Sequence, residues 1–317
     1  MNLRKQYRRT LTAVGATLLM WAIFYNLFMV LVQSVSIALR KLLIETAFEV
    51  TSSLLSGAAY LAAFMLPAAF FKLFCGSKRP EPMRFETKLS GDSLVWILGG
   101  IACGFAFSVI NGIFSSMIGV PEASSVINEA AGYMQDYSLV LQFITIAIVP
   151  AFCEEFLFRG VILSNLMPYG KGLAIIVSSV FFGLMHGSFY QFLYTTAAGI
   201  ILGTIYVVTD SIWASVLMHL INNSWSVLQS AVFERMSEPM ANTVWLMIEG
   251  GIFLVGIVCI AYLVIKYSDK LTVKKLQNVG VARGLEPSEA VKGIFCPSVI
   301  IFISYALLEA MAKLFYV

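Results

Sequence analysis

The segment 243–266 reads TVWLMIEGGIFLVGIVCIAYLVIK, and it decides the fold class. Before its terminal lysine it holds a single ionisable side chain, Glu249, and it exceeds the roughly 20 residues that a helix needs to cross a bilayer. Apolar stretches of similar length recur along the chain, whereas the alternation of a membrane β-strand does not. Because every backbone group in lipid needs an internal hydrogen bond, the sequence predicts a bundle of transmembrane helices.

The composition of the 317-residue chain is that of a membrane protein, with 59% hydrophobic residues, 12% charged residues and a mean hydropathy of +0.84. A soluble globular chain carries about twice that fraction of charge. A soluble enzyme, a disordered protein and a nucleic-acid-binding protein are therefore excluded as descriptions of the whole chain, and the expected partner is the lipid bilayer. The cysteines have no paired spacing and are expected to be buried apolar residues, not a disulfide framework or a zinc cluster: Cys75, Cys103, Cys153, Cys259 and Cys296.

We predict an all-α, polytopic transmembrane bundle of about eight or nine spans. The nine predicted spans are 11–37, 47–74, 93–118, 138–165, 173–188, 190–208, 212–232, 243–266 and 294–315. The first follows a basic tail and is too long for a signal-peptide core, so we expect it to be retained. The map predicts three regions: N-terminal helices with an outer loop (1–137), a central core (138–228), and C-terminal helices with a basic connector (229–317).

The distribution of Lys and Arg predicts the orientation of the chain in the cell membrane. The N-terminal tail holds four of these residues, the stretch 72–92 five and the connector 266–292 six, whereas the loop 121–137 holds none. Because positive residues gather in cytoplasmic loops, we predict a cytoplasmic N-terminus and an extracytoplasmic C-terminus; Arg40 and Lys41 are the exception. The loop 121–137 is either an amphipathic helix on the outer face or an ordinary polar loop.

Ionisable residues inside a membrane span are costly and mark function by default. The fourth predicted span contains Glu154-Glu155-Phe-Leu-Phe-Arg159, directly after Pro150-Ala-Phe-Cys. On a helix, Glu155 and Arg159 are four residues apart and share a face, so they are predicted to form an ion pair. Glu154 lies about 140° around the helix from Arg159, so it is left outside that pair and available for chemistry.

The chain has two histidines, His186 and His219, and both lie inside predicted spans. Asn223 follows His219 by one helical turn on the same face. At about 1.5 Å per residue, Glu154 and the two histidines all fall in the middle third of the bilayer, so three helices of one bundle can bring them together. The alternative is that these polar residues are interhelical hydrogen bonds or a buried ion-pair network without catalytic function.

As chemistry, this set of residues suits hydrolysis. A carboxylate in apolar surroundings is a stronger base than in water, and a neighbouring imidazole can orient the water that it activates. A second imidazole and a carboxamide can donate hydrogen bonds to the oxyanion that forms on the attacked carbonyl. Alternatively, Glu154, His186 and His219 are candidate ligands for one Zn²⁺ or a similar divalent metal with an open position for water. The chain has no H-E-x-x-H motif, which excludes a zincin-type site.

In their order along the chain, these motifs resemble the CPBP intramembrane protease family, which includes the CAAX prenyl endopeptidases and the bacterial Abi group linked to bacteriocin processing and immunity. The resemblance covers roughly residues 138–228 and rests on Glu154-Glu155-x-x-x-Arg159, Phe182-x-x-x-His186 and His219-x-x-x-Asn223.

The resemblance implies a core of about eight helices with an active-site cavity open towards the cytoplasm and the lipid. It implies that Glu154 activates a water molecule with help from His186, that His219 and Asn223 stabilise the oxyanion, and that Glu155 with Arg159 forms a supporting ion pair. The family has been described as metalloproteases, and a metal-free glutamate mechanism has also been proposed for it. We favour glutamate-activated water.

The leading hypothesis is therefore an intramembrane endopeptidase that cleaves a peptide or membrane-anchored substrate, of the CAAX type or a leader or signal-like peptide. The alternative is a non-enzymatic membrane scaffold or bacteriocin-immunity protein that uses the same cavity for binding. A transporter with a proton relay is less favoured, because carboxylates on several helices and broken repeats are not evident in the sequence.

Overall fold

The computed structural model describes residues 3–75, 83–84, 91–119, 138–267 and 285–315. Every regular element within these ranges is helical, which confirms the predicted all-α polytopic bundle. The elements are α1 (Leu3–Leu39), α2 (Glu45–Cys75), α3 (Gly91–Ile118), the composite helix Leu139–Tyr169, α8 (Lys171–Met185), α9 (Phe189–Thr209), α10 (Ile212–Arg235), α11 (Glu238–Tyr267), α13 (Pro287–Ile294) and α14 (Pro297–Phe315). The loop 121–137 and most of the connector 266–292 lie outside the described residues.

All nine predicted spans are helices in the structure, and seven of the described helices are both long and apolar enough to cross a membrane. The two remaining predicted spans, 173–188 and 212–232, correspond to α8 and α10. Helix α8 has only 15 residues. Helix α10 has 24 residues, but polar side chains that include His219, Asn222 and Asn223 lower its hydropathy. The two helices that fall short thus both carry or adjoin the polar residues singled out in the sequence.

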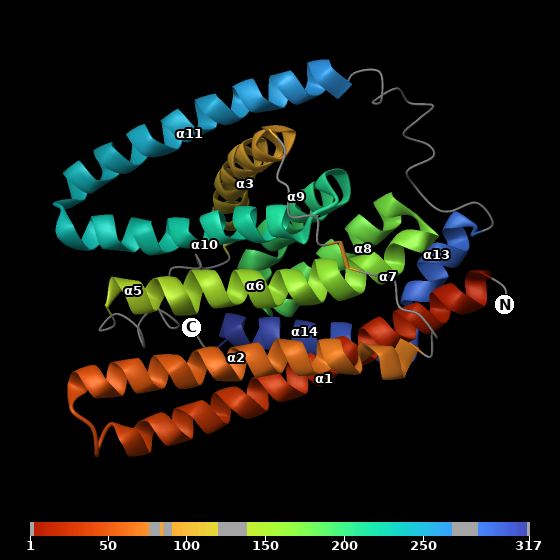
Figure 1. The fold of residues 1–317 in the computed structure, drawn as a ribbon, viewed down its shortest axis with the longest axis horizontal. Helices are drawn as coiled ribbons and strands as arrows, with labels where there is room; N and C mark the ends of the chain where they lie inside the picture. Colours follow the sequence, from red (N-terminus) through yellow and green to blue (C-terminus); the bar gives the residue numbers. More distant parts are fainter. Residues whose placement is uncertain (1–2, 76–82, 85–90, 120–137, 268–284, 316–317) are drawn as a thin grey trace.

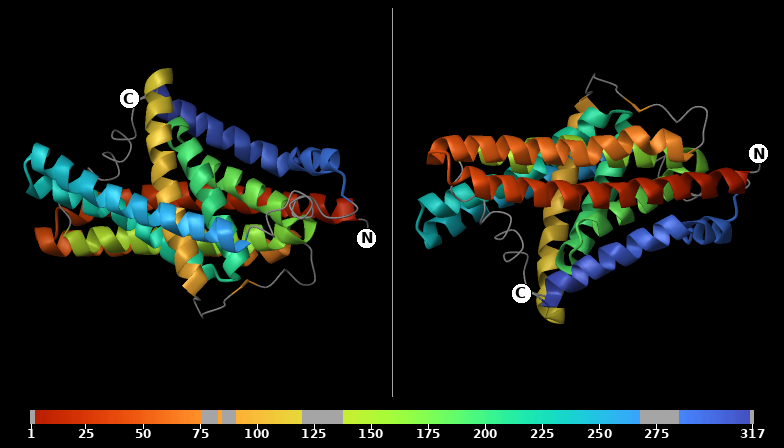
Figure 2. Two further views of the ribbon diagram at one scale, coloured as in Figure 1. Left: turned by 90° about the horizontal axis from the view of Figure 1, so that it is seen from above. Right: turned by 90° about the horizontal axis from the view of Figure 1, so that it is seen from below.

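The bundle is elongated, and its long helices follow two directions (Figures 1 and 2). Helices α1, α2, α10, α11 and the composite helix run roughly along the long axis, whereas α3 and α9 cross them steeply. The start of α1 and the ends of α2 and α11 lie at one end of the long axis, and the turn from α1 to α2 and the connection from α10 to α11 lie at the other. The described helix ends next to the Lys- and Arg-rich segments therefore share one end of the molecule.

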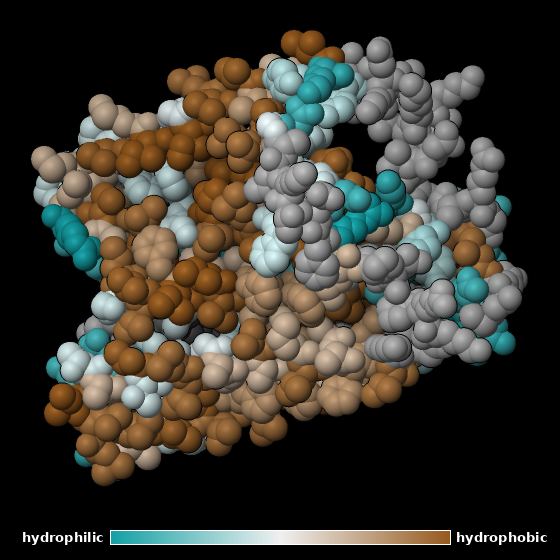
Figure 3. Space-filling view, viewed as in Figure 1, coloured by the Kyte–Doolittle hydropathy of each residue, from teal (hydrophilic) through white to brown (hydrophobic). Residues whose placement is uncertain are grey.

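The face of the molecule seen in Figure 3 is largely hydrophobic over the helices, as a surface that faces lipid requires. Helix α11 shows this most clearly, because Leu246, Val258 and Ile265 are 71%, 68% and 76% exposed. The interior is packed with aromatic side chains; Trp21 of α1, for example, contacts Phe64 of α2 edge to face with 5.7 Å between the ring centroids. Apolar residues thus occupy both the core and the surface, which leaves few places for polar side chains.

The composite helix Leu139–Tyr169 changes its winding along its length. It consists of α5 (Leu139–Gln142), a π-helical turn (Phe143–Ile148), α6 (Val149–Glu155), a second π-helical segment (Phe156–Leu163), α7 (Ser164–Leu166) and a 3₁₀ turn (Met167–Tyr169). Pro150 has no N–H, so the carbonyl of Ile146 cannot have its usual α-helical donor, which accounts for irregular winding just before α6. Such π-helical turns are frequent at functional sites.

Helices α8 and α9 form a tight hairpin whose corner is the pair Gly187 and Ser188. Gly187 has a φ of +53°, a backbone conformation that favours glycine, and its N–H donates to the carbonyl of Leu184. Ser188 caps α9 by accepting a hydrogen bond from the N–H of Gln191. The corner ends α8 at His186 and so determines where this side chain lies.

Candidate active site

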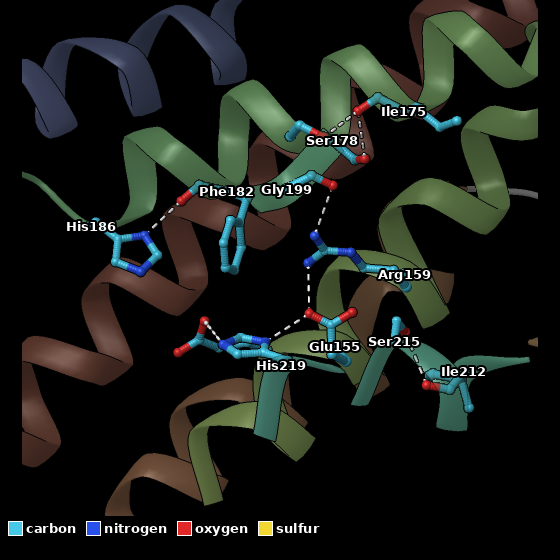
Figure 4. A network of polar contacts seen from close by, with 12 residues as sticks. Glu155, Arg159, Ile175, Ser178, Phe182, His186, Gly199, Ile212, Ser215 and His219 are labelled. Carbon is cyan, nitrogen blue, oxygen red and sulfur yellow. Dashed lines mark hydrogen bonds and ion pairs between the residues drawn. The ribbon is translucent and has the colours of Figure 1, made fainter. Parts of the chain in front are cut away.

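The two glutamates and the arginine of the sequence motif lie on the composite helix, at the junction of α6 and the second π-helical segment (Figure 4). All three side chains are buried, with Glu154 5%, Glu155 0% and Arg159 1% exposed. Charged groups that are removed from solvent to this extent need partners, because an unpaired buried charge is very costly. The contacts of each group therefore indicate its role.

Glu155 and Arg159 form an ion pair with 2.9 Å between Arg159 Nη1 and Glu155 Oε1, as their spacing predicts. A second guanidinium nitrogen donates to the carbonyl of Gly199 on α9 at 3.0 Å, and the guanidinium carbon lies 4.7 Å from the ring centre of Phe182 on α8. Gly199 also permits the close packing of α9 on α8, because a Cβ there would lie 2.9 Å from the Cβ of Ser179. Arg159, on the composite helix, thus contacts both α9 and α8.

His219 of α10 lies between the two glutamates. Its Nδ1 is 2.9 Å from Glu155 Oε1, and its Nε2 is 3.8 Å from Glu154 Oε2. The carboxylate of Glu155 can only accept, so Nδ1 carries the hydrogen of this bond. Glu155 therefore orients the imidazole, and the other ring nitrogen faces Glu154.

Glu154 has one oxygen held and one without a hydrogen bond. The hydroxyl of Tyr60 on α2 donates to Oε1 at 2.5 Å, while Oε2 is buried and has no hydrogen-bond partner among the described residues. Tyr60 was not predicted from the sequence, because a tyrosine in an apolar segment is usually a packing residue; its ring does stack on Phe64 with 4.7 Å between centroids. The one available signal is that a hydroxyl inside a span needs a hydrogen-bond partner.

His186 lies at the end of α8 and faces the same region as His219 (Figure 4). Its Nδ1 is 2.8 Å from the carbonyl of Phe182, and because a carbonyl only accepts, Nδ1 is the donor. In a neutral ring Nε2 is then the acceptor. The Phe182 ring meets both imidazoles edge to face, with centroid distances of 5.0 Å to His186 and 5.9 Å to His219. Phe182 thus spaces the two histidines around Glu154.

Asn223 lies one turn after His219 on α10, and its Nδ2 donates to the carbonyl of Ile146 at 3.3 Å. This is the carbonyl for which Pro150 provides no N–H, so the irregular turn of the composite helix gives Asn223 its partner. The neighbouring Asn222 accepts at Oδ1 from the hydroxyl of Tyr194 on α9 at 2.8 Å, and its Nδ2 donates to Asn223 Oδ1 at 3.5 Å. Asn223 therefore stays near the histidine, and Asn222 is used in packing against α9.

Two other carboxylates on membrane helices, Glu249 and Glu309, have partners on their own helices. Glu249 on α11 accepts from Nε1 of Trp245 at 2.9 Å, and Glu309 on α14 pairs with Lys313 at 3.2 Å. Neither shares a helix with Glu154. Glu249 therefore offers a control carboxylate for experiments on the cluster.

The candidate metal ligands Glu154, His186 and His219 are all among the described residues. Within the part of the chain that the structure describes, no group of three or more His, Cys, Asp or Glu side chains is arranged to hold one ion. Glu154 and His219 are close, and the Phe182 ring contacts the imidazoles of both His186 and His219.

Two comparisons with known proteins bear on the class of the protein. The family described as “Type II CAAX prenyl endopeptidase Rce1-like” matches residues 136–225. A curated protein, “Putative membrane peptidase YdiL” of Bacillus subtilis (strain 168), is 28% identical over 168 residues, which are 52% of this chain and 67% of the relative. A search among solved structures finds no match.

These matches agree with the family resemblance that the motifs carry. Residues 136–225 of this membrane protein are similar to the Rce1-like CAAX prenyl endopeptidases, and the similarity to a membrane peptidase supports a membrane protease at the level of the family. The matched segment 136–225 contains all the residues of the three motifs, from Glu154 to Asn223. Tyr60 and helix α14 lie outside it.

Proposed function

We propose that the protein is an intramembrane endopeptidase in which Glu154 activates a water molecule. One observation carries the proposal: Glu154 Oε2 is buried without a hydrogen bond, 3.8 Å from His219 Nε2, while the hydroxyl of Tyr60 holds the other oxygen. A buried carboxylate oxygen without a donor is expensive unless something else binds there. A water molecule at about 2.8 Å from Oε2 satisfies it and lies beside both histidines.

The hydrogen-bonding roles divide the site into acceptors and donors. Glu154 Oε2 and His186 Nε2 are acceptors that can hold the two hydrogens of one water, which leaves its lone pairs free to attack a carbonyl carbon. The proton of the attacking water passes to Glu154, and the same carboxyl group then returns it to the nitrogen of the leaving amine. Atoms and charges balance over the two steps, and the enzyme is regenerated when both products leave.

Donors for the oxyanion come from α10. In the protonated ring, His219 Nε2–H points to the same region as Glu154 Oε2, and the carboxylate of Glu155 at 2.9 Å balances the ring charge. This use of an acid–histidine pair has a parallel in hydrolases with a catalytic triad. The Nδ2 group of Asn223 donates to the carbonyl of Ile146 at 3.3 Å. Exchanging this long hydrogen bond for one to the oxyanion makes Asn223 the second donor.

The substrate class follows from the surroundings of the site. The glutamates lie within a helix of 31 residues that is apolar enough to span a membrane, so a scissile peptide bond must enter from a membrane-anchored or hydrophobic segment. The matched family is described by its action on CAAX prenyl proteins. We propose a CAAX-type protein, a leader peptide or a signal-like peptide as substrate.

A comparison of peptide termini tests this function. Membranes and medium from cells that produce the wild type are compared with those from cells that produce Glu154→Gln at matched levels. New termini that appear only with the wild type support proteolysis and reveal the sequence of the cleavage site. Identical termini, together with a biological phenotype that survives in the variant, would contradict it and favour a binding or immunity protein.

Tyr60→Phe is expected to lower turnover by about 10- to 100-fold, the usual range for losing a hydrogen bond to a charged group. The variant lets the carboxylate of Glu154 rotate, and it keeps the ring that stacks on Phe64. The measurement is kcat of the reconstituted protein, with thermal unfolding as the check on folding. The control is Tyr262→Phe on α11, which removes a hydroxyl that contacts Asp92 and Lys266. It should leave kcat unchanged. Equal kcat in both variants would remove Tyr60 from the mechanism.

Asn223→Ala is expected to raise the barrier by about 2–4 kcal/mol, the range found for one lost oxyanion donor. Substrate binding in the ground state should change little, so the effect is on kcat and not on KM. Asn111→Ala on α3 is the matched control, because its Nδ2 also donates to a backbone carbonyl, that of Tyr190, at 3.0 Å. Turnover of the Asn223 variant at the level of the control would show that the oxyanion has other donors.

A further inference from the structure

Helix α14 contacts the corner of the chain that carries His186, although α14 lies outside the residues that match the family. Lys313 Nζ donates to the backbone carbonyl of His186 at 3.2 Å. Lys313 also pairs with Glu309, one turn earlier on α14, at 3.2 Å. The carboxylate of Glu309 in turn lies against Gly187, because a Cβ added to that glycine would be 2.6 Å from the Glu309 carboxyl carbon. Two charged side chains therefore enclose the corner after α8.

The contact has a clear physical basis at the end of a helix. The last carbonyls of a helix have no intrahelical donor, and a positive charge there is favourable for the helix dipole. Lys313 supplies the hydrogen-bond donor and the positive charge at the end of α8, where it contacts the carbonyl of His186. Gly187 has a φ of +53° and no room for a side chain, so the chain reverses direction directly against Glu309. The backbone of His186 is thus fixed from outside its own hairpin.

The position of this backbone sets the position of the imidazole. The ring is anchored to its own helix by the 2.8 Å bond from Nδ1 to the carbonyl of Phe182, so ring and corner move as one unit. The Phe182 ring also meets His219 and lies under the guanidinium of Arg159. A shift of the corner therefore changes where His186 Nε2 lies relative to the other groups of the cluster.

Helix α14 is itself held firmly and can act as a support. Ser298 donates to the carbonyl of Thr12 on α1 at 3.0 Å, and Asn26 of α1 donates to the hydroxyl of Tyr305 at 2.8 Å. The ring of Phe302, which is buried, meets Phe181 of α8 edge to face with 6.2 Å between centroids. Lys313 and Glu309 thus extend from a helix that is packed on both α1 and α8.

We propose that Lys313 and Glu309 are positioning residues for His186, so that the C-terminal helix forms part of the working active site. The inference rests on the peptidase function proposed above, in which His186 holds the water. It assigns a role to α14, which the motifs do not include.

The first test is the kinetics of Lys313→Met, which removes the donor and keeps an unbranched side chain. We expect kcat to fall about tenfold, the scale of one lost charge-assisted hydrogen bond, with KM unchanged, and Lys313→Arg to restore most of it. Lys266→Met is the matched control: Lys266 is also in the last turn of its helix, is 40% exposed compared with 36% for Lys313, and pairs with Asp92 at 2.6 Å. It should keep wild-type kcat.

The second test measures the chemical accessibility of His186 and does not depend on catalysis. The chain has only two histidines, so modification of each by diethyl pyrocarbonate can be followed by mass spectrometry of two peptides. Lys313→Met should raise the rate at His186 and leave the rate at His219 unchanged, and Lys266→Met should change neither. Unchanged labelling of His186, or unchanged kcat with altered labelling, would overturn the proposal. If the wild type cleaves no peptide, the proposed function fails, while the labelling still decides whether α14 positions His186.

Discussion

Glu154→Gln is expected to lower peptide cleavage by about 10³-fold or more while the protein stays folded, because a general base contributes on this scale. Glutamine keeps the volume of the side chain and an oxygen that can accept from the Tyr60 hydroxyl, so the contact with α2 survives. It cannot take a proton from water. The measurement is turnover of the reconstituted protein on a peptide that spans the cleavage site found in cells, together with thermal unfolding in detergent.

The matched control for this variant is Glu249→Gln. Glu249 is also a membrane carboxylate with one donor, Nε1 of Trp245 at 2.9 Å, but it lies on α11, away from the histidines. It should retain wild-type turnover. If the Glu154 variant turns over as fast as the Glu249 variant, Glu154 is not the base, and the mechanism proposed here is wrong.

Arg159→Ala should cause the largest loss of stability, about 3–5 kcal/mol of unfolding free energy, because it leaves a buried carboxylate without its cation. Glu155 is 0% exposed and has Arg159 at 2.9 Å. The variant also removes the donor to the carbonyl of Gly199 and the cation over the Phe182 ring. Activity should fall with stability, since Glu155 orients His219. Denaturant unfolding and the yield of folded protein measure the effect.

Two further variants separate the buried charge from the loss of side-chain volume. Arg159→Met combined with Glu155→Gln removes both charges and should recover most of the lost stability, because no uncompensated charge remains. Arg235→Ala, which breaks an exposed ion pair with Glu234 at 3.7 Å, should cost less than about 1 kcal/mol. An Arg159→Ala protein as stable as Arg235→Ala would mean that Glu155 needs no cation.

The helices were predictable because hydropathy and helical spacing are local properties. Nine apolar segments were expected and nine are helical, with the length or the polar residues of α8 and α10 explaining why only seven qualify as spans. The ion pair between Glu155 and Arg159 was predictable for the same reason. Its partners are four residues apart, and they meet even though the segment is π-helical.

The partners of Glu154 were not predictable. Tyr60 is 94 residues away along the chain and looks like a packing residue in its apolar segment. The contacts of His219 with Glu155, 64 residues away, and with Glu154 are likewise not encoded in its spacing to Asn223. Asn223 donates to Ile146, which needs a donor because of Pro150. The sequence predicted that these residues lie at similar depths in the membrane. It did not predict how each helix is rotated about its axis.

The sequence by itself thus determined the class of fold, the places of the helices, the internal ion pair and the resemblance to a family. Each of these depends on a local pattern: apolar length, spacing on one helix, or the order of short motifs. The tertiary structure alone decided that the hydroxyl of Tyr60 holds Glu154, that His219 lies between two carboxylates, and that Lys313 reaches the end of α8. These contacts join distant helices, and they depend on how each helix is rotated and crossed against its neighbours, which local patterns do not encode.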